Sequence, residues 1–182
     1  MDEQKKTAKY DNECYANLAN AIVVQAVDDW KAAQKTLWKT PNKPEAIRLK
    51  NDSERFFCSD WYKTLCQYPA KDLLVKLPGM AKKELYDDTL RKWINAYKLL
   101  QTLKPGIKTN DKRRKCAERK IKDAESDFWS KWFMTLYSKH PEDLIEECKA
   151  TAEKEIAEEE ERKRLYREAK KAAKKVSSGV QK

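Results

Sequence analysis

Two stretches of this chain, 71 residues apart, are close to copies of each other. ERFFCSDWYKTL at 54–65 and ESDFWSKWFMTL at 125–136 share a glutamate, a phenylalanine, a serine, a tryptophan, a threonine and a leucine, and a short break and an Asp-Leu pair follow each. A single repeat of this length predicts a duplicated helical module, because a solenoid needs about three or more stacked repeats to be stable. Such a scaffold usually presents binding surfaces.

Apolar residues in steps of three and four predict the helices of the first copy. Pro44 suits the first turn of a helix, and Pro78-Gly79 is expected to end one. The expected helices cover 11–37, 44–66 and 70–77. In the second copy Trp93 matches Trp30, so the same order of helices is expected there.

The chain is therefore predicted to be all-α: two similar three-helix units followed by a charged helix. Unit one is expected to cover 11–79, unit two 80–149, and the charged C-terminal helix with its frayed tail 150–182. The matched tryptophans lie 63 residues apart but the later motifs 71 apart, so eight extra residues fall between them in the second copy. We expect these residues to form a basic loop insertion over 104–122.

The repeated motifs also carry aromatic rings and a glutamate at matching positions. Glu54 and Glu125 share the predicted inner face of the helix, where a buried carboxylate needs a partner such as an amide or an indole N–H. The rings divide into an expected core set and an expected outer set that could stack on a base or a partner. The core set is Phe57, Trp61, Phe128 and Trp132, and the outer set is Tyr62, Trp129 and Phe133.

The segment 104–122 holds nine basic residues against two acidic ones, in a chain of net charge +10. Clustered lysine and arginine favour a polyanion, because neutralising phosphates releases their counterions. No motif that reads bases accompanies them, so no strong sequence specificity is expected. A solvated run of charge is the alternative interpretation. The candidate binding residues are Lys104, Lys108, Lys112, Arg113, Arg114, Lys115, Arg119, Lys120 and Lys122.

Catalytic and metal-binding patterns are missing from the sequence. His140 is the single histidine, the five cysteines never form a CxxC pair, and three glycines cannot build a phosphate-binding loop. The expectation is a protein that is not an enzyme and holds no cofactor and no metal. The sequence has no stretch of about 18 apolar residues and no secretory signal, so a cytoplasmic protein without a membrane partner is expected.

AIVVQAVDDWKAA (21–33) and ERFFCSDWYKTL (54–65) resemble a family of small helical proteins from phages and mobile elements of Gram-positive bacteria. That family has an A-I-V-x-Q-A-V-x-D-aromatic-basic pattern, a proline-containing turn, and then E-R-F-F-x-S with two aromatic residues. The chain departs from it at Cys58, where a basic residue is usual, and at Pro69-Ala70-Lys71, where Asp-Gly-Glu is common. The resemblance covers residues 15–77 well and the second copy as a diverged version.

In that setting, the length and the doubled architecture resemble those of an anti-CRISPR protein that acts on type II CRISPR systems, of which type II-A is one. The hypothesis is that the chain binds a guide-loaded type II CRISPR nuclease in the host bacterial cell and blocks double-strand DNA cleavage without chemistry. A basic chain cannot mimic DNA, so it would contact the guide RNA, the target duplex or an acidic surface through 104–122. The alternative is a phage DNA- or RNA-binding accessory protein for replication or recombination. A third reading is a structural adaptor that dimerises through its aromatic faces.

Overall fold

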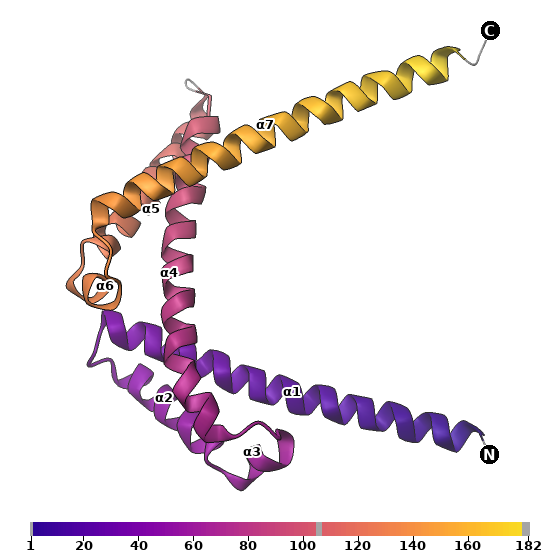
Figure 1. The fold of residues 1–182 in the computed structure, drawn as a ribbon, viewed down its shortest axis with the longest axis vertical. Helices are drawn as coiled ribbons and strands as arrows, with labels where there is room; N and C mark the ends of the chain where they lie inside the picture. The colour runs from indigo at the N-terminus through magenta and orange to yellow at the C-terminus, as the bar shows by residue number, and fades with distance from the viewer. Residues whose placement is uncertain (1, 105–106, 180–182) are drawn as a thin grey trace. The chain divides into compact units, whose positions relative to one another are not determined.

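The computed structural model describes residues 2–104 and 107–179, and these residues are almost entirely helical (Figure 1). Helix accounts for 88% of the chain, and the described part contains no strand. The predicted all-α class is therefore confirmed. None of the helices in the described ranges is both long enough and apolar enough to span a membrane.

The described residues form seven helices, which divide between two compact units. Unit 1 runs to Asp87 and unit 2 begins at Asp88, so the boundary falls inside a helix. The helices are α1 (Asp2–Lys39), α2 (Pro44–Phe57), α3 (Asp60–Leu65), α4 (Ala70–Thr102), α5 (Lys108–Phe128), α6 (Lys131–Leu136) and α7 (Pro141–Gly179).

The core of unit 1 forms where α1, α2, α3 and the first part of α4 meet. Phe57 and Tyr62 pack edge to face, with ring centroids 5.7 Å apart. Burial of each such ring is worth about 1.5–3 kcal/mol. The buried members of this cluster are Trp30, Phe57, Tyr62, Leu77 and Ala81.

Each copy of the repeated motif breaks into two helices at its serine, where a single helix over 44–66 was expected. Ser59 has an extended backbone, and its hydroxyl accepts a hydrogen bond from the Tyr62 amide at 3.2 Å. Ser130 accepts from the Phe133 amide at 3.3 Å in the same way. These serines are N-caps, which satisfy an amide that the new helix leaves without a partner. The prediction of a continuous helix is therefore wrong.

This break moves the aromatic residues onto different faces from those predicted. Trp61, expected in the core, is 57% exposed, whereas Tyr62 and Phe133, expected outside, are 1% and 0% exposed. Trp132 is half-buried. A new helix begins after each serine, so the spacing of 3.6 residues per turn counted from Phe57 or Phe128 does not continue past it. The residues after the serine therefore face other directions than a continuous helix would give them. Burial of those two phenylalanines, both 0% exposed, is confirmed.

Helix α4 continues through Pro78 and Gly79, so the expected end of a helix at 77 is wrong. A proline inside a helix costs about 3 kcal/mol because it removes a backbone hydrogen bond. Here Leu77 and Ala81, on either side of it, are fully buried in the core of unit 1, and this packing offsets the cost. The predicted boundary between 79 and 80 therefore lies within α4.

The charged C-terminal helix is the second half of α7 and not an element of its own. Cys148 and Ala152 are both buried, so the helix crosses the predicted boundary at 149/150 while still packed in unit 2. Helix α7 also extends to Gly179, into the segment expected to be frayed, and residues 180–182 lie outside the described part.

The predicted partners of the two repeated glutamates are confirmed. In unit 1 the Trp30 indole Nε1 donates to Glu54 Oε1 at 3.0 Å, and in unit 2 Trp93 Nε1 donates to Glu125 Oε1 at 3.0 Å. The first bond joins α1 to α2, and the second joins α4 to α5. The duplication of the whole module stays a prediction, which these matching contacts support.

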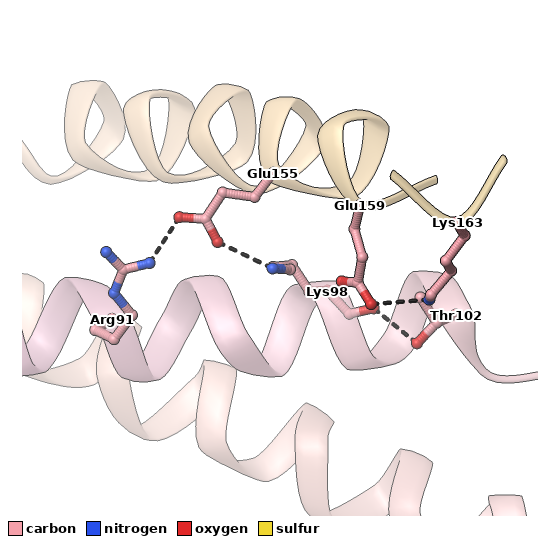
Figure 2. Close-up of polar contacts among 6 residues, drawn as sticks. All are labelled: Arg91, Lys98, Thr102, Glu155, Glu159 and Lys163. Carbon is pink, nitrogen blue, oxygen red and sulfur yellow. Dashed lines mark hydrogen bonds and ion pairs between the residues drawn. The ribbon is translucent and has the colours of Figure 1, made fainter. Parts of the chain in front are cut away.

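A second pair of acidic residues, also 71 positions apart, is held in a similar way. Glu84 accepts from Lys31 at 2.6 Å and pairs with Lys35 at 2.9 Å in unit 1. Burial raises the pKa of Glu84, but hydrogen bonds from both lysines outweigh it, and the pKa lies below its usual value. In unit 2, Glu155 takes the matching role between α4 and α7 (Figure 2).

Candidate nucleic-acid interface

The predicted basic loop insertion is mostly helix, because α5 begins at Lys108. Its inner side is apolar: Ala117, Ala124 and Phe128 are buried in unit 2. Glu125, on the same helix, accepts the Trp93 indole bond and so fixes α5 against α4. These contacts set which side of α5 turns to solvent. The prediction of a loop over 104–122 is therefore wrong from residue 108 onward.

Four predicted binding residues share the outer side of α5. They follow one another at steps of three, four and three, which places them within an arc of about 80° on a helix of 3.6 residues per turn. All four are exposed, and the run rises about 15 Å along the helix axis. We call this set the α5 basic face: Lys112, Lys115, Arg119 and Lys122.

Four of the other predicted residues are not part of this face. Arg114 is half-buried, and its Nη2 donates to the Leu103 carbonyl at 3.2 Å, so it ties the start of α5 to the end of α4. Arg113 and Lys120 are exposed but lie on the flank nearer the buried side. Lys104 is exposed in the α4–α5 connection. The side chain of Lys108 lies outside the described residues.

Acidic residues border the α5 basic face on both sides, with the exposed Asp123 about 20° beyond Lys112 on the groove side. Asp111 and Glu118 are exposed and lie roughly 100–120° around the helix from Ala117, between the buried side and the basic face. The α5 basic face is therefore a strip of four cations with acidic side chains along its two borders. Such a strip fits the phosphates of a nucleic acid, which a helix can meet in sequence along a groove about 12 Å wide.

A groove of about 640 Å³ lies within unit 2 on the other flank of α5. Its floor is made of small and apolar side chains of α4 and α5, including Ala96 and Leu99. Its rim carries both signs of charge, with Lys120 near Asp123. A surface of mixed sign does not attract a polyanion as the α5 basic face does, so we place the candidate interface on that face.

Of the rings predicted to be available for stacking, Trp129 alone is exposed. It is 49% exposed and packs edge to face on His140, with ring centroids 5.7 Å apart. Tyr62 and Phe133 are buried in their units, so the prediction that they stack on a partner is wrong. The signal that could have corrected it is the serine before each of them, which is a favoured N-cap.

The cysteines of the described part are free thiols, and one of them is buried. Burial raises the pKa of Cys148 to about 11, which keeps its thiol protonated and unreactive near neutral pH. His140 Nδ1 lies 3.9 Å from a Glu142 carboxylate oxygen at the exposed start of α7. Among the described residues, no group of three or more histidine, cysteine or acidic side chains could hold a metal ion.

Comparison with protein-family models, with curated proteins and with solved structures found no match. The function of the chain therefore has to be inferred from its own surfaces.

Proposed function

We propose that the protein is a non-enzymatic inhibitor that binds a guide-loaded type II CRISPR nuclease and prevents double-strand DNA cleavage. The α5 basic face is the observation that carries this proposal, because four exposed cations on one helix face suit the phosphates of a guide RNA or a target duplex. The resemblance of residues 15–77 to helical proteins of phages and mobile elements supports the same setting.

The sign of the charge determines the mode of inhibition that we propose. An inhibitor that replaces DNA in a positively charged channel has to be acidic, whereas this chain has a net charge of +10. Contact with phosphates positions a protein on a nucleic acid but carries no sequence information by itself. The protein would therefore dock on the nucleoprotein through the α5 basic face, irrespective of the guide sequence. Inhibition would follow occupancy and would saturate at a fixed molar ratio.

A cleavage assay tests the proposal directly. The protein is titrated into a guide-loaded type II nuclease cutting a plasmid, and in parallel into a restriction enzyme cutting the same plasmid. We expect loss of the RNA-guided cut alone, with a sharp end point in the molar ratio. Loss of both cuts would favour the alternative function, a DNA-binding accessory protein. No effect across several nucleases of this type would contradict the inhibitor proposal.

Two variants of equal charge locate the surface. The face variant replaces the four residues of the α5 basic face by glutamine, and it should lose inhibition while keeping its helicity. The control variant removes four exposed cations from unit 1 and should inhibit like the wild type. Its substitutions are Lys43→Gln, Arg48→Gln, Lys71→Gln and Lys83→Gln. Equal inhibition by both variants would remove the α5 basic face from the mechanism.

The structural adaptor remains the rival from another class. Dimerisation through aromatic faces would need exposed rings, and the two repeated motifs expose Trp61 and Trp129. Sedimentation tests the adaptor proposal, because the adaptor has to be a dimer at micromolar concentration, and a monomer would contradict it.

A further inference from the structure

The charge of α7 changes sign abruptly between Glu161 and Arg162. Residues 153–161 hold six acidic residues and one basic residue, whereas residues 162–182 hold nine basic residues and one acidic residue. A helix whose charges served only solubility would mix the two signs along its length. The segregation therefore indicates that the two parts of α7 do different work.

The acidic part of α7 binds to α4 within unit 2. Glu155 accepts hydrogen bonds from Arg91 Nη1 at 2.7 Å and Lys98 Nζ at 3.0 Å, and Figure 2 shows its carboxylate between the two cations of α4. These bonds lower the pKa of Glu155, with Lys98 contributing most. Glu159 is half-buried and pairs with Lys163 at 2.8 Å.

Beyond Glu159 the helix leaves the packed part of unit 2. Every residue from 160 to 171 is exposed, while the helix continues to Gly179 (Figure 1). We call residues 162–179, up to the end of the helix, the α7 arm. Its helical form is supported locally by pairs such as Arg164 with Glu161 at 2.6 Å, each worth about 0.2–0.5 kcal/mol. The arm is thus a preformed helix that needs little further ordering on binding.

Five basic residues of the α7 arm share one side of the helix, and Arg162 lies about 80° outside it. Lys163, Arg167 and Lys170 follow at steps of four and three, with Arg164 and Lys171 beside them, so they cover an arc of about 120°. Like charges three or four positions apart repel each other by about as much as opposite charges attract. With eight basic residues and one acidic residue over 162–179, the arm cannot neutralise itself. A polyanion relieves this repulsion.

The exposed apolar residues argue against the other partners of a basic helix. A helix that lies on a lipid surface needs a face of large apolar residues, and a helix that docks in a protein groove needs apolar anchors at i, i+3 or i+4, and i+7. The bulky apolar residues of the arm are Leu165 and Tyr166, which are neighbours in sequence, and Val176, ten positions after Tyr166. They do not make such a face.

We propose that the α7 arm is a second phosphate-binding surface, which contacts the backbone of duplex DNA independently of the α5 basic face. The arm spans about 20 Å from Arg162 to Lys175 at 1.5 Å per residue, which suits several successive phosphates of a duplex. Contact of this kind is strong at low salt and indifferent to sequence. The inference does not rest on the proposed function, because DNA alone is the ligand.

Binding of the full-length protein to a short labelled DNA duplex, measured by fluorescence anisotropy over a range of salt concentrations, tests this inference. The arm variant carries four substitutions in the α7 arm, with the control variant of unit 1 as its match. Loss of four phosphate contacts should reduce the slope of log K against log [salt] by up to about 3.6 and weaken binding at least about tenfold near 0.1 M salt. The substitutions are Lys163→Gln, Arg167→Gln, Lys170→Gln and Lys171→Gln.

A second variant works in the opposite direction and keeps every cation. Glu160→Gln with Glu161→Gln removes acidic charge next to the arm and should tighten DNA binding. Circular dichroism checks that all variants keep wild-type helicity. Equal slopes for the arm variant and the control variant, absence of DNA binding by the wild type, or binding to phosphatidylserine vesicles in place of DNA would each overturn the proposal. If the arm variant loses DNA binding but still inhibits cleavage, the proposed function is unaffected.

Discussion

The hydrogen bond between Trp93 and Glu125 holds α5 in the orientation that exposes its basic face, so its removal should cost measurable stability. Trp93 is 1% exposed, and its Nε1 lies 3.0 Å from Glu125 Oε1. Glu125→Leu leaves a buried N–H without this acceptor, which costs about 1–3 kcal/mol. Glu125→Gln keeps an acceptor but loses its charge, so the cost should be about 1 kcal/mol.

Urea unfolding followed by far-UV circular dichroism measures both costs. With a slope of about 2 kcal/mol per M, a loss of about 2 kcal/mol for Glu125→Leu lowers the midpoint by about 1 M. A double-mutant cycle with Trp93→Phe isolates the bond itself, and the coupling should be about 1 kcal/mol or more. The matching pair in unit 1, Trp30 with Glu54, is the internal control and should couple by a similar amount. Additive effects within about 0.5 kcal/mol would refute the reasoning for unit 2.

Three further predictions concern stability. Gly79→Ala should stabilise the protein by about 0.5–1 kcal/mol, because a Cβ there meets nothing within 4 Å and alanine favours the helix; an unchanged urea midpoint would count against this. Phe57→Ala should lower the free energy of unfolding by about 3–5 kcal/mol and Trp61→Ala by less than about 1 kcal/mol, because the first ring is fully buried and the second is mostly exposed. The reverse order in urea unfolding would favour the expected continuous helix over 44–66. The pKa of Glu155 lies below its usual 4.5, so the stability that its charge contributes is present above pH 4.5 and is lost as the pH falls through the lowered value. Glu155→Gln should therefore lose less stability than the wild type as the pH falls through that range. An unchanged dependence of stability on acid pH would contradict this.

The helical class and the long first helix could be predicted from the sequence, because apolar residues at a period of 3.6 reflect burial directly. That Glu54 and Glu125 need a hydrogen-bond partner could also be predicted, since a carboxylate on an apolar helix face is costly to bury without one. The sequence did not reveal the breaks at Ser59 and Ser130. Extending the apolar period across a serine hid its role as an N-cap, and that single error exchanged Trp61 with Tyr62.

Pro78 misled the prediction in the opposite direction, because a local helix breaker gave way to tertiary packing of its neighbours. The candidate interface was found by residue type, but the α5 basic face was not. Nine cations could be counted from the sequence, whereas their division into an exposed face, a flank and the half-buried Arg114 depends on how α5 packs. The α7 arm could have been found by counting charge in shorter windows, which separates Glu161 from Arg162.

The most direct measurement is the salt dependence of binding between the protein and a guide-loaded type II nuclease, for the wild type, the face variant and the control variant. If the α5 basic face contacts phosphates of the nucleoprotein, the wild type and the control variant should share a steep slope of log K against log [salt]. The face variant should lose up to about 3.6 from that slope, for four contacts at about 0.9 each. Identical slopes for all three proteins, or no binding of the wild type to the loaded nuclease, would contradict the account.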